Sequence, residues 1–312
     1  MDNLKIFSGN ANRPLAIAIC KHLRIPLGDA DVFQFSNENI FVKINENVRD
    51  QDVFLVQPFS SPVNRSIMEL LIMIDAFKRA SSARITAVIP YYAYGRTDKK
   101  DQPRVPITAR LIADCITVAG ADRVLTMDMH AGQIQGFFNI PVDELTGQII
   151  QARYFSEKGL KNFTVVSADE GFAKKARMLA DRLNAPLAVI EKRRLGNNGI
   201  TEAMGIIGSV EGRDAVIVDD EIDTAGSLTQ AVRVAREHGA CDIYCCATHA
   251  VLSGPAIERL KNASIKEIVI TDTIPSPNLK LLPNMTVLSV AELFAGTISR
   301  IHDGRSVSEL FW

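Results

Sequence analysis

The stretch Arg213–Leu228 reads RDAVIVDDEIDTAGSL, and it holds the features that decide the fold. Its apolar run, residues 215–218, is mostly β-branched, which is typical of a strand buried on both faces. Four carboxylates follow within five positions, and then the small or hydroxylated residues TAGS. Apolar residues at helical spacing come next and mark one face of a helix that ends near residue 238. The stretch therefore predicts a strand, an acidic corner, a small-residue turn and a helix.

The turn between this strand and this helix has the composition of an anion site. Small residues leave backbone N–H groups accessible, and a helix N-terminus favours negative charge. Acidic side chains beside a bound phosphate are suited to holding sugar hydroxyls or Mg²⁺. The Gly-Lys-Ser/Thr of a nucleoside triphosphate P-loop is missing from the stretch. An ordinary polar strand-to-helix corner is the alternative, but acids directly after a buried strand favour a sugar-phosphate site.

The bulk composition sets the class of protein. The chain has 312 residues, enough for about two domains at the usual ~100–200 residues each. Hydrophobic residues make up 47% and charged residues 23%, as in soluble globular proteins, and the net charge of -1 offers no general attraction to nucleic acid or to a membrane. The five cysteines show no CxxC spacing, and no signal peptide or membrane span is predicted. We expect a cytoplasmic protein.

Predicted strands and helices alternate along the whole chain. This alternation favours an α/β fold of mostly parallel sheets with helices on both faces. Residues 141–145 are interpreted as a hinge between a first domain, 1–145, and a second domain, 146–312. The final predicted helix, residues 291–302, is a candidate to pack back on the first domain.

Two further strand ends carry polar clusters. Asp128-Met129-His130 follows a predicted strand in the first half, and its carboxylate and imidazole can reach one metal ion or one polyphosphate; the alternative is a structural role in the turn. Asp169 follows a strand in the second half. It is either a second carboxylate near the same ion or a helix cap.

Two cationic loops are also predicted. Lys192-Arg193-Arg194 precedes the glycine- and asparagine-rich run 196–199, so it is either a solvated face or a flap that closes over a polyphosphate. In the loop YGRTDKK, Arg96 can fork onto phosphate oxygens. Phe35, before a polar turn, can stack on a base whose edge Asn37 and Asn39 read; a core position for this ring is the alternative.

These motifs together resemble a known family. The stretch VIVDDEIDTAGSL resembles the 5-phosphoribosyl-1-pyrophosphate motif of type I phosphoribosyltransferases. With FSNENIFVKINENVR, TMDMHAGQIQGFF and the KRR run, the chain resembles the ribose-phosphate pyrophosphokinases from end to end. The resemblance implies two phosphoribosyltransferase-like domains, ATP and Mg²⁺ at their junction, and ribose 5-phosphate on the second. It also implies transfer of a diphosphoryl group to the sugar, and a homohexamer built from dimers.

The resemblance assigns roles to particular positions. The ribose 5-phosphate residues are Asp219, Asp220, Asp223, Thr224, Ala225, Gly226 and Ser227. The catalytic residues are Lys192 and Arg194. The metal positions are His130 and Asp169, with Asp128 beside them. The ATP residues are Phe35, Asn37, Glu38, Asn39, Arg96 and Thr97.

The sequence departs from the family pattern at three positions. The family commonly has acids at positions 37 and 39 and glutamine at position 97, whereas this chain has Asn37, Asn39 and Thr97. Two rival functions share parts of this pattern. A phosphoribosyltransferase that consumes the product needs neither the first domain nor an ATP site. A regulatory relative without activity would have lost the flap cations or the acidic pair, all of which are present.

Overall fold

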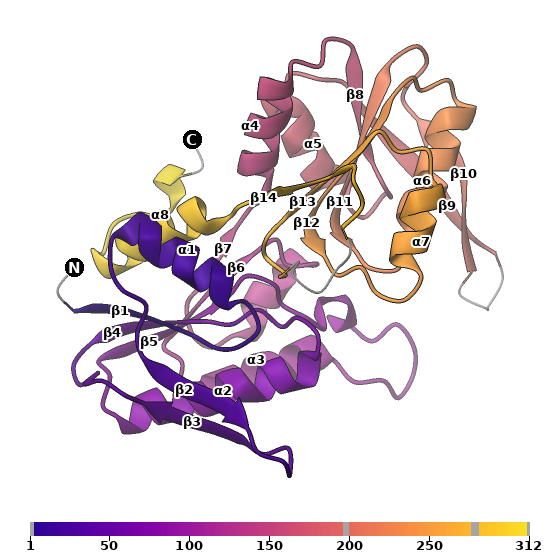
Figure 1. The fold of residues 1–312 in the computed structure, drawn as a ribbon. Coiled ribbons are helices and arrows are strands. Elements are labelled where there is room, and N and C mark those ends of the chain that lie inside the picture. Colours follow the sequence, from indigo (N-terminus) through magenta and orange to yellow (C-terminus); the bar gives the residue numbers. More distant parts are fainter. Residues whose placement is uncertain (1–2, 196–199, 276–280, 311–312) are drawn as a thin grey trace. The chain divides into compact units, whose positions relative to one another are not determined.

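The computed structural model describes residues 3–195, 200–275 and 281–310, apart from the side chains of 192–204. Within it the chain forms two compact units (Figure 1). Unit 1 comprises residues 1–146, 273–275 and 289–312, and unit 2 comprises 147–272 and 276–288. Each unit has its own sheet and its own buried core, so each is described by itself.

Unit 1 is built on a five-stranded parallel sheet of order β1-β4-β5-β6-β7. Helices α1 and α8 cover one face of this sheet, and α2 and α3 cover the other (Figure 1). The elements are β1 (Leu4–Ser8), α1 (Arg13–Leu23), β2 (Ala30–Gln34), β3 (Ile40–Ile44), β4 (Asp52–Val56), α2 (Val63–Arg79), β5 (Arg84–Ile89), the 3-10 turn η1 (Gly95–Thr97), α3 (Thr108–Ala119), β6 (Arg123–Met127), η2 (Gly132–Phe137), β7 (Val142–Leu145), α8 (Ala291–His302) and η4 (Ser308–Leu310).

The predicted hinge 141–145 has regular structure. Residues Val142–Leu145 form strand β7, which pairs in parallel with β6 at the edge of the sheet, and the first unit divides from the second just after it. Its charged residues are anchored locally, because Asp143 pairs with Arg123 at 2.6 Å. At the start of helix α2, Pro62 occupies the cap position, after a cis peptide bond, and no side chain caps the helix.

Unit 2 is built on a seven-stranded sheet of order β10-β9-β8-β11-β12-β13-β14, in which only the β9–β10 pair is antiparallel. Its elements are α4 (Gln148–Lys158), β8 (Phe163–Ser167), α5 (Ala173–Arg182), β9 (Leu187–Leu195), β10 (Ile200–Ile207), β11 (Asp214–Ile222), α6 (Gly226–Glu237), β12 (Ile243–Ala250), α7 (Ala256–Asn262), β13 (Glu267–Thr271) and β14 (Met285–Leu288).

Strand β11 shows why helices cover both faces of this sheet. Successive side chains of a strand point to opposite faces. Ala215 and Ile217 belong to the core beneath α6 and α7, whereas Val216 and Val218 belong to the core beneath α4 and α5. The predicted α/β class, with mostly parallel sheets covered on both faces, is confirmed.

The largest local differences also lie in unit 2. Helix α4 was not predicted, and residues 192–195 continue strand β9, which pairs with β10, where a cationic loop was expected. The acidic residues at 219–221 lie within the last part of β11 and not after it.

Candidate functional site

Three acids meet at one edge of the unit 2 sheet. Asp219 and Asp220 lie near the end of β11, and Asp169 follows the end of β8. The two strands are parallel neighbours, with Val218 opposite Ser167. Because the carboxyl ends of parallel strands meet at the same edge, the structure brings these acids together.

The acid cluster changes the titration of its central member. Burial raises the pKa of Asp219 well above its ordinary value, and the negative charges of Asp220 and Asp169 raise it further. Backbone N–H groups also donate to these carboxylates: the Asp220 N–H to Asp219 Oδ1 at 2.9 Å, and the Glu221 N–H to Asp220 Oδ1 at 2.9 Å. Such a site is stabilised by a nearby cation or by hydroxyl donors.

The turn after β11, which we call the 223–227 turn, has the backbone geometry of an anion cradle. Ala225 is left-handed, with φ 60° and ψ 9°, and helix α6 begins at the next residue without a side-chain cap. A left-handed residue beside a helical one points successive N–H groups into one concavity, the arrangement that binds phosphate. Thr224 and Ser227 are exposed at this turn. The sequence-predicted residues 223–227 are therefore grouped where an anion site needs them.

Two residues that the sequence did not single out brace this turn. The Ser253 N–H donates to the Asp223 carbonyl oxygen at 3.0 Å, and its hydroxyl donates to the Asp223 carboxylate. Arg259, from α7, donates to the Thr224 carbonyl oxygen at 3.0 Å. Both braces come from the segment after β12, about thirty residues along the chain, and no local pattern signals them.

Asp169 has a structural task in addition to its place in the cluster. Its Oδ1 accepts the Phe172 N–H at 3.0 Å, which closes the turn leading into α5. Phe172 occupies the cap position of α5 and no side chain caps this helix, so Asp169 holds the preceding turn and is not the cap residue. The chain leaves β8 tightly here, because the Ser167 hydroxyl donates to the Asp169 carbonyl oxygen at 2.6 Å.

The backbone of Lys192 and Arg194 lies in β9, opposite Ala203 and Thr201 of β10. The prediction of a loop at these residues is wrong, because the strand continues and pairs through them. Their side chains, and the run 196–199, lie outside the described residues.

In unit 1, the ends of the neighbouring strands β5 and β6 are close together. A Cβ built on Gly95 would lie 3.0 Å from the Cβ of His130, so the 3-10 turn that carries Arg96 packs against that histidine. Arg96 and His130 are exposed, whereas Asp128 is buried and left-handed, with φ 40°. The structure thus groups three of the predicted nucleotide and metal positions.

Thr97 and the hairpin tip are organised differently. The Thr97 hydroxyl donates to the Tyr94 carbonyl oxygen at 2.7 Å, a bond within its own turn. The candidate residues at 35–39 form the tip between β2 and β3, closed by the Phe35 N–H donating to the Asn39 carbonyl oxygen at 2.8 Å. The Asn37 amide oxygen accepts the Asn39 N–H at 3.2 Å.

The Phe35 ring is not a core residue. It is 48% exposed and forms a cluster with Phe33 and Phe41, whose ring centroids lie 5.1 and 5.7 Å away. An exposed aromatic face of this kind can stack on a base, and the position argues against the alternative of a buried ring.

Within the described residues, no three or more His, Cys, Asp or Glu side chains form a group that could hold a metal ion on their own. In the same part of the chain, no helix is both long and apolar enough to cross a bilayer.

The α/β fold, with an acidic strand end beside the 223–227 turn, is typical of the class of proteins that bind phosphorylated ribose. Residues 4–120 match the family model described as the N-terminal domain of ribose phosphate pyrophosphokinase, and residues 197–312 match the phosphoribosyl synthetase-associated domain. The chain belongs to the ribose-phosphate pyrophosphokinase family.

Similarity to relatives extends over the whole chain. A ribose-phosphate pyrophosphokinase of Caldanaerobacter subterraneus is 58% identical over 99% of this chain and 98% of the relative. One of Clostridium perfringens is 54% identical over 99% and 98%. The crystal structure of phosphoribosylpyrophosphate synthetase from Mycobacterium smegmatis is 42% identical, covers 97% of this chain and 99% of that one, and superposes with a TM-score of 0.91.

Proposed function

We propose that this chain transfers the β,γ-diphosphoryl group of ATP to the anomeric hydroxyl of ribose 5-phosphate, giving 5-phosphoribosyl 1-diphosphate and AMP. The observation that carries the proposal is the pairing of an acidic edge with an anion cradle at the end of β11. Family membership over the whole chain supports the same reaction.

The sugar phosphate is assigned to unit 2. Its 5-phosphate lies in the 223–227 turn, where the N–H groups at the start of α6 converge. Asp219 and Asp220 accept hydrogen bonds from the ribose hydroxyls. Since these carboxylates are crowded and partly buried, hydroxyl donors relieve part of the repulsion between them.

The nucleotide is assigned to unit 1. The Arg96 guanidinium pairs with phosphate oxygens and the Phe35 ring stacks on the adenine, while residues 37–39 and Thr97 lie nearby on the base and ribose side. Asparagines at positions 37 and 39 keep amide oxygens that accept the adenine amino group. The Asn37 oxygen already accepts the Asn39 N–H, so Asn39 is the better placed of the two as an acceptor.

Mg²⁺ fits the donors present on the chain. Magnesium is held by one or two carboxylates together with substrate phosphates and water, so it does not need a closed cluster of protein ligands. Asp128, His130 and Asp169 are the residues that would hold it. When bound, the ion neutralises charge on the polyphosphate.

The remaining work is alignment and charge neutralisation. Diphosphoryl transfer proceeds in line and requires little covalent participation by the protein. Lys192 and Arg194, on the hairpin β9–β10, supply positive charge to the diphosphoryl group during its transfer. The family resemblance also supports a cytoplasmic homohexamer built from dimers. Light scattering on the purified protein would test this oligomeric state.

The test is an AMP-release assay with ATP, ribose 5-phosphate and Mg²⁺. We expect turnover only when all three are present, and Lys192→Ala should lower kcat by at least about 10²-fold with unchanged far-UV circular dichroism. Pyrophosphate release that depends on an added nucleobase would instead indicate a phosphoribosyltransferase. Absence of turnover with intact substrate binding would indicate a regulatory relative.

A further inference from the structure

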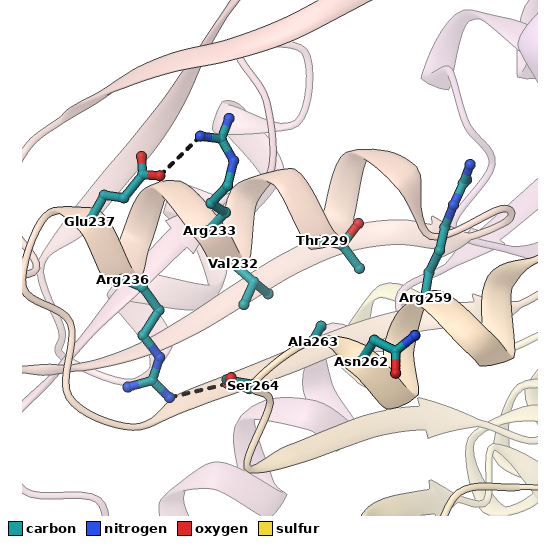
Figure 2. A pocket seen from close by; sticks show the side chains of 9 residues that line it. All are labelled: Thr229, Val232, Arg233, Arg236, Glu237, Arg259, Asn262, Ala263 and Ser264. Atoms are coloured by element: carbon teal, nitrogen blue, oxygen red, sulfur yellow. Dashed lines mark hydrogen bonds and ion pairs between the residues drawn. The ribbon is translucent and has the colours of Figure 1, made fainter.

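A pocket of about 500 Å³ lies between α6 and α7 of unit 2 (Figure 2). Three arginines line it. Two of them are held within the pocket's own wall: Arg233 pairs with Glu237 at 2.9 Å, and the Arg236 Nη2 donates to the Ser264 carbonyl oxygen at 3.1 Å. Arg259 differs, because its side chain extends from α7 toward the N-terminal end of α6 and away from these pairs (Figure 2).

The contact that Arg259 makes is with the anion cradle. Its Nη1 donates to the Thr224 carbonyl oxygen at 3.0 Å. In a planar trans peptide the carbonyl and the following N–H point in opposite directions. A Thr224 carbonyl that faces Arg259 therefore directs the Ala225 N–H away from the arginine. Ala225 is the left-handed residue of the cradle, so Arg259 sets the orientation of its first peptide group.

The guanidinium also packs directly against the cradle. A Cβ added to Gly226 would lie 3.2 Å from Arg259 Nη1, so the arginine occupies the space that a side chain would need. A positive charge is thereby placed behind the turn. Asp223, at the other end of the turn, is held by Ser253. The segment from Ser253 to Arg259 thus braces the cradle at two points.

We propose that Arg259 is a positioning residue for the phosphate of ribose 5-phosphate. It orients the 223–227 turn and adds positive charge behind it, without touching the substrate. The inference rests on the proposed function in one respect, that this turn holds the 5-phosphate. An arginine that only joined α7 to α6 would contribute to stability and leave substrate affinity unchanged.

The experiment compares Arg259→Gln with Arg233→Gln. The control removes a charge of the same kind from the same pocket, but at a residue that pairs with Glu237 and not with the turn. We expect Arg259→Gln to raise the KM for ribose 5-phosphate about tenfold, the size expected for a lost hydrogen bond to a charged group. The KM for ATP and the kcat should stay within about twofold, because the nucleotide is assigned to unit 1.

Arg259→Lys distinguishes the contribution of the positive charge from that of the guanidinium's hydrogen-bond geometry. Lysine keeps the charge but lacks the planar fork of donors, so the KM for ribose 5-phosphate should lie between those of the parent and the glutamine variant. Direct calorimetry, with ribose 5-phosphate and with inorganic phosphate in the absence of ATP, should show the same order of affinities.

The outcomes are distinct. Equal ribose 5-phosphate affinity in Arg259→Gln and the parent overturns the inference. So does a parallel loss of ATP and ribose 5-phosphate affinity with a lowered Tm, because that pattern marks a general loosening of the fold. If the parent protein shows no AMP release but its ribose 5-phosphate binding still depends on Arg259, the proposed reaction fails and the positioning role stands.

Discussion

The negative charge of Asp169, just after the end of β8, helps to raise the pKa of Asp219, which lies near the end of the neighbouring strand β11. Burial is the larger cause, and Asp220 contributes more than Asp169. The cluster therefore costs stability in the absence of a ligand. This is the pattern expected where binding requires charges that the fold alone does not favour.

The first prediction follows from that cost. A carboxyl whose pKa is higher in the folded than in the unfolded protein destabilises the fold as pH rises above the unfolded value, near ~4. Asp219→Asn removes this cost, so its Tm should exceed that of the parent at pH 7.5 by about 2–4 °C, and the difference should shrink as the pH is lowered toward ~4. Ribose 5-phosphate affinity should fall at least about tenfold.

Differential scanning calorimetry across pH measures the first effect, and substrate titration measures the second. Asp181→Asn, at an exposed position on α5, is the matched control and should change neither quantity. A lower Tm for Asp219→Asn at neutral pH would contradict the repulsion argument.

The second prediction concerns the last helix. Asp52 is 8% exposed and contacts two side chains of unit 1, with Arg84 Nε at 2.8 Å and His302 Nδ1 at 2.8 Å. Arg84 also donates to the carbonyl oxygen of Ile301, so this cluster fastens α8 to the sheet of unit 1. Asp52→Asn leaves Arg84 without its counter-ion and should cost about 2 kcal/mol of stability.

Urea denaturation followed by circular dichroism measures this loss. The control is Asp75→Asn, which breaks the exposed pair with Arg79 one helical turn away and should cost at most about 0.5 kcal/mol. Equal effects of the two substitutions would show that the buried cluster does not hold α8.

The third prediction tests the exposed aromatic cluster. Phe35→Ala should raise the KM for ATP about tenfold, because stacking on a base is worth about 1–3 kcal/mol. Ribose 5-phosphate affinity and Tm should change little, since the ring is 48% exposed. Val118→Ala, which truncates an 81% exposed side chain on α3, serves as the control. An unchanged KM for ATP would remove Phe35 from the nucleotide site.

The fourth prediction concerns the thiols. Burial raises the pKa of Cys20 to about 11, and Cys245 and Cys246 are also buried, whereas Cys241 is exposed. Because the thiolate is the reactive form, iodoacetamide at pH 8 should label Cys241 first and Cys20 only after unfolding. Peptide mass spectrometry of briefly treated protein would show this order. Early labelling of Cys20 would mean that α1 opens readily.

Much of unit 2 was predictable because its strands have clear apolar patterns. The run 215–218 is buried on both faces, and its identification as a strand leading into a helix is confirmed. The acids at 219–221 were predicted to follow the strand, but they lie within it. Strand β11 extends to Ile222 because β12 pairs with it that far, with Glu221 opposite His249. The boundary of the strand is set by a neighbour and not by local composition.

Other elements lack a local signal. Helix α4 buries Gln148 and Gln151, so it has no continuous apolar stripe. Strand β9 includes the three cationic residues 192–194 because β10 pairs with it there. The braces Ser253 and Arg259 act only through the folded structure. Their place beside the 223–227 turn depends on the crossing from β11 to β12, which a single sequence does not reveal.

Helix α8 packs against α1, yet all of unit 2 is encoded between them. On the ribosome, the apolar face of α1 therefore emerges long before its covering helix is synthesised. During that interval the nascent chain exposes this apolar surface, while the sheet of unit 2 can already assemble. Completion of the first unit is in this sense a late step in folding during synthesis.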